Sequence, residues 1–326
     1  MPSGPNKYLA NMTVKSLGRR GMRQLTRRRW FQSKPLLAPL LRTFWRYLRA
    51  PTPEAGAAAV RALAMSQPSA YPILFRDRHD LEYVLYPGQN AEIYLASIGN
   101  YEIGETEFCV RRIRPGMTAF DVGANIGLYT LLFAKCAGPT GRVHAFEPEP
   151  RNFGRLLVNL AINRLENVTA NQSAVFARSE PLVLNVYPEA VHALHSLGRA
   201  SVPHPTEPGR MLEPECRLTV PAASLDDYCA GHGIDRIDYL KIDVEGAELD
   251  VLRGSAGLLA RRAIGLIQFE ALPSQANDSA GDAAGGVFGL LNDHGFRCHP
   301  IGRTGQLLPE ASAACTGYTN YAALGG

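Results

Sequence analysis

The segment Phe120-Asp121-Val122-Gly123-Ala124-Asn125-Ile126-Gly127 constrains the fold of this chain more than any other feature. It predicts a buried strand that runs through a glycine-rich turn into a helix. About twenty residues further on, Phe146-Glu147-Pro148 predicts a second strand that ends on a carboxylate. An open α/β sheet binds the ribose of a nucleoside with these parts in this order. We therefore expect a nucleoside-containing cofactor; the structural alternative is glycines that serve only a turn and a carboxylate that is solvated.

The glycine spacing indicates which nucleoside is bound. A dinucleotide fingerprint, G-x-G-x-x-G, lets a pyrophosphate approach the backbone at the helix N-terminus. Here Asn125 and Leu128 occupy the second and third glycine positions, which disfavours a pyrophosphate. Asp121, the remaining glycines and Glu147 suit S-adenosylmethionine, because that cofactor has no phosphate.

A third segment, Tyr239 to Glu248, predicts another strand and turn and carries three carboxylates, Asp243, Glu245 and Glu248. Asp243 and Glu245 are two residues apart, so on a continuing strand they would face the same way and raise each other's pKa. One of them could then accept a proton near neutral pH. The alternative is that Asp243 caps the following helix and Glu248 lies in its first turn.

Clustered acids also suit a metal. Asp243 and Glu245, with Glu270 at the end of a later apolar strand, could supply oxygen ligands to magnesium. Nothing in the sequence requires a metal, and we predict none.

Several motifs together resemble the FkbM-type family of S-adenosylmethionine-dependent methyltransferases. The resemblance spans about Glu102 to Glu270 and includes DVGANIG, FEPEP, the helix with Asn152 and Asn159, Ser224-Leu225-Asp226-Asp227 and KIDVEGAE. It implies the α/β class I methyltransferase fold, which is Rossmann-like. We therefore expect a seven-stranded, mostly parallel sheet with helices on both faces and an antiparallel last strand. The alternation of strand and helix patterns from Met117 to Glu270 favours a parallel sheet independently.

The resemblance also implies roles for individual residues. It places the methionine portion of the cofactor at the first loop, the ribose at Glu147 and the adenine near Gln172 to Ala174. Asp243 and Glu245 match positions near the transferred methyl group. The implied cofactor-binding residues are Asp121, Gly123, Asn125, Gly127, Glu147, Pro148, Gln172, Ser173, Ala174 and Asp243.

Family members typically methylate hydroxyl oxygens of sugars or secondary metabolites. A neutral hydroxyl is a poor nucleophile, so a positioned base contributes about 10²–10⁴-fold. The candidates for this catalytic role are Asp243, Glu245 and His195, although a lone loop histidine is more often structural. His195 lies in an insertion between two runs, Leu182 to Tyr187 and Arg217 to Val220, that alternate like a hairpin.

The expected acceptor is a small molecule or the hydroxyl of a glycan or glycolipid. We expect its specificity to lie in this insertion, in Leu272 to Gly286 and in Tyr101 to Glu107. Within that last stretch, Glu102 and Glu105 are either surface charges or ligand contacts.

The N-terminal fifty residues hold twelve Lys and Arg and no Asp or Glu, whereas the rest of the chain has 22 basic and 30 acidic residues. We therefore divide the chain into a basic extension (1–50), a linker (51–70) and a methyltransferase domain (71–326). The pI near 8.7 describes the extension and not the enzyme.

Residues 37–49 predict an amphipathic helix with Trp45 and Phe44 opposite arginines. Such a helix can lie on an anionic membrane, pack on the core or on a partner, or bind nucleic acid. A nucleic-acid methyltransferase is the runner-up function, along with a non-catalytic binder. The nucleic-acid methyltransferase is disfavoured because nucleobase amino methyltransferases carry an Asn/Asp-Pro-Pro-Tyr type of motif where this chain has Asp243-Val244-Glu245-Gly246.

The six cysteines are scattered without C-x-x-C spacing, which favours a reducing compartment. The N-terminus lacks the features of a secretory signal, and the run at 37–49 is too short to span a bilayer. We expect a cytoplasmic enzyme with peripheral contact to the inner membrane.

Overall fold

The computed structural model describes residues 72–85, 101–187, 202–203, 211–271, 283–313 and 320–325. All of them belong to the compact unit Ser69–Gly326. The expected extension, the linker and the helix at 37–49 lie outside the described residues.

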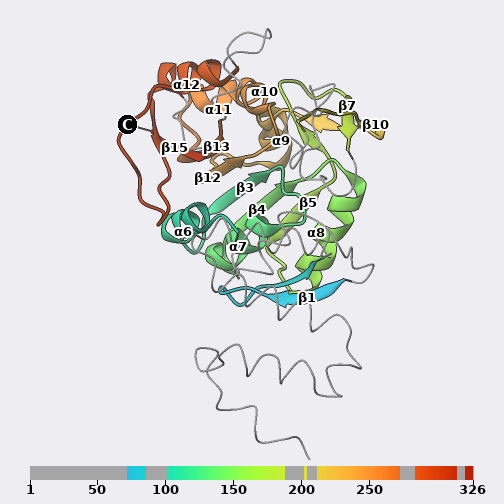
Figure 1. Cartoon of the computed structure of the whole chain (residues 1–326). Coiled ribbons are helices and arrows are strands. Elements are labelled where there is room, and N and C mark those ends of the chain that lie inside the picture. The colour runs from blue at the N-terminus through green and yellow to red at the C-terminus, as the bar shows by residue number, and fades with distance from the viewer. Residues whose placement is uncertain are drawn as a thin grey trace, which may run out of the picture. The chain divides into compact units, whose positions relative to one another are not determined.

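A seven-stranded sheet forms the centre of this unit (Figure 1). Across the sheet the strands are β14 (Phe296–Pro300), β15 (Asn320–Gly325), β13 (Leu266–Glu270), β12 (Tyr239–Ile242), β3 (Thr118–Val122), β4 (Arg142–Phe146) and β5 (Val168–Asn171). The strands from β13 to β5 run parallel, and β15 is antiparallel to both of its neighbours. The expected mostly parallel sheet with an antiparallel last strand is confirmed. The strand order reverses between β3 and β12, which is where open α/β sheets bind ligands.

Helices cover both faces of the sheet (Figure 1). One face carries α6 (Ile103–Arg112), α7 (Leu128–Ala137) and α8 (Pro150–Ile162). The other carries α9 (Leu225–His232), α10 (Glu248–Arg253), α11 (Ala256–Ala260) and α12 (Ala283–Asp293). The expected alternation of strands and helices from Met117 to Glu270 is confirmed.

The two faces of β3 contribute to different parts of the core. Phe120 and Val122 pack in the cluster that contains residues of α9 to α12, whereas Ala119 packs in the cluster with α6 to α8. Since side chains alternate along a strand, Asp121 shares the face of Ala119 and points toward α7. The sheet thereby carries a carboxylate into the interior on the α7 side.

The sequence pattern from Val168 to Val175 predicts one continuous third strand, but the structure divides it in two. β5 ends at Asn171, and Ala174–Val175 form a separate short strand, β6, which pairs in parallel with β11 (Ala222–Ala223). The chain leaves the main sheet between them because β6 pairs with a strand from the insertion.

The hairpin-like pattern in the insertion is confirmed, since β7 (Leu182–Val186) and β10 (Cys216–Val220) pair antiparallel. Between them, β8 (Val202–Pro203) pairs with β9 (Met211–Leu212). His195 lies outside the described residues.

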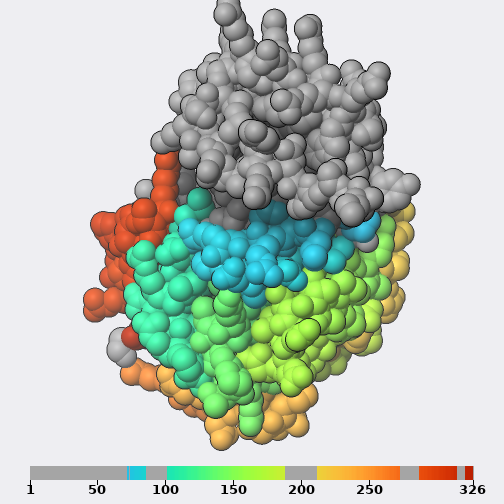
Figure 2. Space-filling model, turned by 90° about the horizontal axis from the view of Figure 1, so that it is seen from below, coloured from blue at the N-terminus to red at the C-terminus, as the bar shows by residue number. Residues whose placement is uncertain are grey.

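An N-terminal hairpin, β1 (Ile73–Arg76) and β2 (Glu82–Leu85), lies apart from the main sheet. Figure 2 shows it across the surface formed by α7 and α8. Its residues Leu81, Tyr83 and Leu85 are buried in the same core cluster as residues of α6 to α8. The hairpin is therefore part of the core that supports β3.

Candidate active site

The loop between β3 and α7 has a backbone that glycine makes possible. Gly123 has φ +85°, and a Cβ built there would lie 1.8 Å from the carbonyl oxygen of Asp243. Gly127 has φ +96°, and its Cβ would lie 2.6 Å from Cδ1 of Leu156. Asn125 between them is also left-handed, at φ +50°. The loop thus approaches the end of β12 more closely than any side chain at position 123 would permit.

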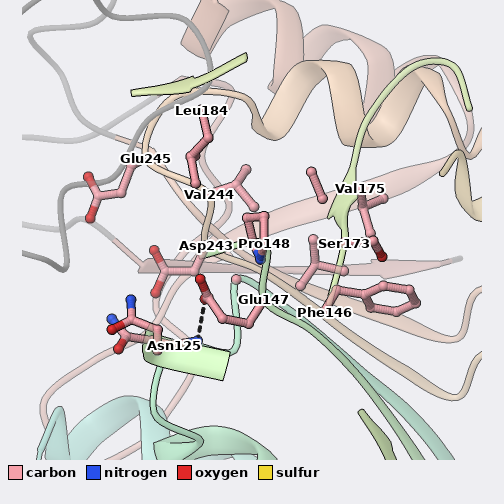
Figure 3. Close-up of a pocket in the computed structure, with 14 residues that line it drawn as sticks. Asn125, Phe146, Glu147, Pro148, Ser173, Val175, Leu184, Asp243, Val244 and Glu245 are labelled. Atoms are coloured by element: carbon pink, nitrogen blue, oxygen red, sulfur yellow. Dashed lines mark hydrogen bonds between the residues drawn. The ribbon is translucent and has the colours of Figure 1, made fainter. Parts of the chain in front are cut away.

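Glu147 ends β4 and is held by backbone N–H groups. Its Oε2 accepts from the N–H of Asn125 at 2.8 Å, the bond drawn in Figure 3, and its Oε1 accepts from the N–H of Glu149 at 2.9 Å. Burial raises the pKa of Glu147 to about 7, although both backbone bonds favour the charged form. Each carboxylate oxygen can accept a second hydrogen bond. Glu147 is therefore an oriented acceptor that can also bind the diol of a ribose.

A pocket opens at the carboxyl ends of β3, β4 and β12 (Figure 3). Phe146, Val175, Leu184 and Val244 supply apolar parts of its wall. Of the residues predicted to bind the cofactor, those that line this pocket are Gly123, Asn125, Glu147, Pro148, Ser173, Ala174 and Asp243.

Three of the predicted cofactor residues do not line the pocket. Gln172 is exposed to solvent. Gly127 begins α7, and Asp121 is fully buried. Leu184 of β7 lines the pocket although the sequence analysis did not single it out; its place in an alternating strand of the insertion was the available signal.

Asp121 has one oxygen that lacks a partner. Its Oδ2 accepts from the hydroxyl of Thr130 at 2.5 Å, while Oδ1 has no hydrogen-bond partner among the described residues. Oδ1 of Asn125 also has no hydrogen-bond partner among the described residues. Burial raises the pKa of Asp121, and nearby Lys241 opposes this shift. Two unpartnered acceptor oxygens at this loop fit the ammonium group of a methionine moiety, because a buried acceptor is normally satisfied.

Lys241 is a buried cation beneath the site and was not singled out from the sequence. It is 2% exposed, its Nζ lies 2.8 Å from Oδ2 of Asp243, and it stands 4.3 Å from the centroid of the Tyr129 ring. Burial lowers the pKa of Lys241, but Asp243 and Asp121 outweigh it and the pKa is raised. The signal was a lysine within a wholly buried strand, where a charge has to be paired.

Asp243 and Glu245 are not on one continuous strand, so that part of the prediction is wrong. β12 ends at Ile242, and Glu245 has φ +55° in the turn that follows. One carboxylate oxygen from each of Asp243, Glu245 and Glu270 nevertheless lies within 4.8 Å of the other two. A turn and a neighbouring strand, rather than strand periodicity, bring these acids together.

Glu270, at the end of β13, has a raised pKa. Burial is the main cause, followed by the charges of Asp243 and Glu245, and the pKa rises to about 9. Glu270 is therefore protonated at neutral pH and adds an O–H donor to the acid cluster, which we define as Asp243, Glu245 and Glu270.

The cap expected at Asp243 is absent, whereas the turn position expected for Glu248 is present. Ala247 is the N-cap of α10 and makes no side-chain cap bond. Glu248 lies in the first turn, and its Oε1 accepts from the N–H groups of Gly246 at 3.0 Å and Val244 at 3.3 Å. Glu248 closes the turn and leaves Asp243 paired with Lys241.

Glu102 is partly buried and does not line the pocket. The Tyr129 hydroxyl donates to its carboxylate. Burial and then the charge of Asp243 raise the pKa of Glu102 to about 7. The pKa of Tyr101 is raised by Glu102, by burial and by Asp243 and Glu270, so this phenol also faces the acidic groups.

The acid cluster offers oxygen atoms of the kind that magnesium accepts. Lys241 already supplies a positive charge beside Asp243.

The fold and the pocket together define a class. A glycine loop packed on β12, a carboxylate at the end of β4 and unpartnered acceptors near the methionine position identify an S-adenosylmethionine-dependent methyltransferase of class I. A model of the family described as the methyltransferase FkbM domain matches residues 121–298. The chain belongs to the FkbM methyltransferase family, and S-adenosylmethionine is its cofactor.

Relatives with assigned names are methyltransferases. The chain is 31% identical over 231 residues to 31-O-demethyl-FK506 methyltransferase FkbM of Streptomyces tacrolimicus, covering 62% of this chain and 85% of that protein. It is 30% identical over 143 residues to Methyltransferase 1 of Beauveria bassiana (strain ARSEF 2860), covering 41% of this chain and 56% of that protein. The crystal structure of methyltransferase FkbM from Methylobacillus flagellatus KT aligns with a TM-score of 0.38 and 14% identity, over 72% of this chain and 52% of that one.

Among the helices that the structure describes, none combines the length and apolar character needed to cross a membrane.

Proposed function

We propose that this enzyme transfers the methyl group of S-adenosylmethionine to a hydroxyl oxygen of a sugar, a glycan or glycolipid, or a secondary metabolite. The observation that carries the proposal is the acid cluster beside the cofactor pocket. Asp243 and Glu245 line the pocket itself, and Glu270 lies against both. Carboxylates orient hydroxyl donors and can accept their protons.

The bound cofactor supplies an electrophilic methyl group on a sulfonium. The protein has to hold the acceptor oxygen in line with it and exclude water. Glu147 and the loop from Gly123 to Gly127 position the cofactor, while Asp243 and Glu245 face the acceptor side. Asp243 or Glu245 would accept the proton of the acceptor hydroxyl as its oxygen takes up the methyl group that the bound cofactor supplies.

Asp243 and Glu245 are our candidates for the base, and Glu270 is a donor to the acceptor. The Nζ of Lys241 lies 2.8 Å from Oδ2 of Asp243 and orients that carboxylate. Protonated Glu270 can donate to an oxygen of the acceptor while a neighbouring carboxylate accepts the reacting proton. His195 remains a candidate from the sequence alone.

The test is turnover and cofactor binding of Asp243→Asn and Glu245→Gln. We expect at least one variant to lose about 10²–10⁴-fold in kcat, with the Kd of S-adenosylhomocysteine changed less than turnover. Asp250→Asn is the matched control, since that carboxylate pairs with Arg253 on α10 at 3.0 Å. If both site variants turn over normally, the base lies elsewhere and His195→Ala is the next variant.

Acceptor screening starts from the names of the relatives. One of them is named 31-O-demethyl-FK506 methyltransferase, which indicates methylation at an oxygen of its substrate. Hydroxylated macrolides, free sugars and glycolipids are therefore the first panel. Methyl transfer to nucleic acid, the second candidate, would be indicated if the panel is inert and RNA or DNA is methylated.

Turnover in the presence of EDTA tests whether the enzyme requires a divalent metal ion. We expect full turnover in EDTA, because Lys241 provides the positive charge at Asp243. Loss of activity in EDTA that magnesium restores would instead assign the acid cluster as a ligand set.

We also propose that the enzyme is cytoplasmic and contacts the inner membrane through residues 37–49. The support is the sequence, in which Trp45 and Phe44 oppose Arg42, Arg46 and Arg49 on a helical projection. Flotation of the full chain with anionic vesicles should fall when Phe44 and Trp45 are replaced by serine. Unchanged flotation would show that residues 37–49 do not bind the membrane.

A further inference from the structure

Asn159 of α8 is fully buried, and its side-chain amide joins two separate parts of the chain. Its Nδ2 donates to the carbonyl of Ile126 in the cofactor loop at 2.8 Å. Its Oδ1 accepts from the N–H of Val84 in β2 at 2.9 Å. One amide therefore connects the N-terminal hairpin to the loop that lines the cofactor pocket.

A second asparagine, Asn163, lies one helical turn further along the chain and contacts the same strand. Its Oδ1 accepts from the N–H of Glu82 at 2.8 Å, and its Nδ2 donates to the Glu82 carbonyl at 2.6 Å. Residues four apart share a helix face, so the two amides replace part of a partner strand for β2. Asn159 differs from Asn163 in reaching the cofactor loop.

The bond from Asn159 to the Ile126 carbonyl stabilises an unusual backbone conformation in the cofactor loop. Ile126 lies between Asn125 and Gly127, which both have positive φ, at +50° and +96°. Such a backbone persists when its surroundings hold it, and a buried carbonyl needs a donor. The N–H of Asn125 in the same turn donates to Glu147 at 2.8 Å. The donor on Asn159 therefore helps to set the geometry of both Asn125 and Glu147.

The hairpin has additional contacts with the helices that flank the loop. Arg78 pairs with Glu107 of α6, and Nζ of Lys135 in α7 donates to the carbonyl of His79. Figure 2 shows the hairpin spread over this helical surface. It is packed on the same helices that carry the cofactor loop.

We propose that Asn159 is a positioning residue for the S-adenosylmethionine site, and that through it cofactor binding is coupled to docking of the β1–β2 hairpin. Coupling of this kind is reciprocal, so the cofactor stabilises the hairpin by the same factor by which the docked hairpin strengthens cofactor binding. The inference concerns cofactor binding alone and does not depend on the proposed acceptor.

The first test compares Asn159→Asp with Asn163→Asp, using titration calorimetry with S-adenosylhomocysteine. Both place the same carboxylate on α8 and both keep an acceptor for β2. Asn159→Asp loses the donor to Ile126 and leaves its carbonyl unsatisfied, whereas Asn163→Asp loses the donor to the carbonyls of Glu82 and Asn159 and leaves the cofactor loop untouched. We expect about tenfold weaker binding for Asn159→Asp and less than about threefold for Asn163→Asp. Equal weakening, or unchanged affinity of Asn159→Asp, would overturn the proposal.

The second test uses the wild-type protein and remains available if Asn159→Asp does not fold. Hydrogen exchange is followed at the amide of Val84 with and without S-adenosylhomocysteine. The amide of Ala311, which bonds to the carbonyl of Cys298 at 2.8 Å, is the reference. We expect the ligand to slow exchange at Val84 more than at Ala311. No change at Val84, or equal slowing at both, contradicts the coupling.

Discussion

Glu147 and Asp243, which we propose to face the cofactor and the acceptor respectively, are held in the pocket by different means. Glu147 accepts from two backbone N–H groups at 2.8 and 2.9 Å. Asp243 is instead paired at 2.8 Å with the buried ammonium of Lys241, close to Glu245 and Glu270. The backbone orients the first acid, and the charges of neighbouring side chains balance the second.

This difference separates two tasks. A carboxylate held by backbone donors keeps its geometry when surrounding side chains change, which suits a cofactor that is constant. Acids balanced by other side chains respond strongly to each substitution, which suits an acceptor that varies between enzymes. Variants on the cofactor side should therefore change the affinity for S-adenosylhomocysteine, and variants on the acceptor side should change stability, turnover or pH dependence.

The largest effect is expected from Lys241→Met. Removing the ammonium leaves Asp243 and buried Asp121 without their shared cation. We expect a loss of about 3–5 kcal/mol in the free energy of unfolding, measured in urea. Arg253→Met is the control, because Arg253 is itself exposed, and breaking its ion pair with half-buried Asp250 should cost less than about 1 kcal/mol. Equal losses in the two variants would show that Lys241 does not balance the acceptor side.

Gly123→Ala should abolish tight cofactor binding. The new Cβ would lie 1.8 Å from the Asp243 carbonyl oxygen, so the loop and the end of β12 have to separate. We expect S-adenosylhomocysteine to bind at least about 100-fold more weakly, since overpacking and a strained φ each cost about 1–3 kcal/mol. At Gly154 of α8 a Cβ would meet no atom within 4 Å, so Gly154→Ala should bind normally. Tight binding by Gly123→Ala would refute the close approach of the loop to β12.

Glu147→Gln should weaken S-adenosylhomocysteine binding by about one to two orders of magnitude, because a charged hydrogen bond is worth about 1.5–3 kcal/mol. Glu149→Gln is a nearby control, since Glu149 caps α8 through the N–H of Asn152 at 2.7 Å and does not line the pocket. Calorimetry measures both. An unchanged Kd for Glu147→Gln would show that this residue does not bind the ribose.

The smallest effect is a change in how stability depends on pH. The pKa of Glu270 is raised to about 9, above its ordinary value of 4.5. The folded state then holds a proton that the unfolded state releases, so this contribution is complete below pH 4.5 and is lost as the pH rises through 9. Glu270→Gln should flatten the decline in unfolding free energy between pH 7 and 9 by up to about 1.4 kcal/mol per pH unit. Identical slopes would show that Glu270 does not carry the extra proton.

Local sequence patterns predicted the strands and helices well, because each element of an α/β sheet has its own periodicity. The glycine loop and Glu147 were predicted for the same reason, since their spacing follows from one β-α unit. The break between β5 and β6 was missed because it depends on pairing with β11, which lies far along the chain. Glu270 was considered from the sequence as a metal ligand, and its raised pKa depends on burial and on charged neighbours from two other segments, the turn after β12 and Glu102.

The sequence by itself determined the fold class, the family and the cofactor, because glycine positions and strand-end carboxylates encode a local backbone geometry. The tertiary structure alone decided how charge is shared at the site. It placed Lys241 under Asp243, brought Glu245 to Glu270 through a left-handed turn, and used Asn159 to join β2 to the cofactor loop. Lys241 and Asp243 are only two residues apart, and the burial of Lys241 in β12 is what makes their pairing necessary. The other two relations depend on distances between segments far apart in the chain, and no local pattern records such distances.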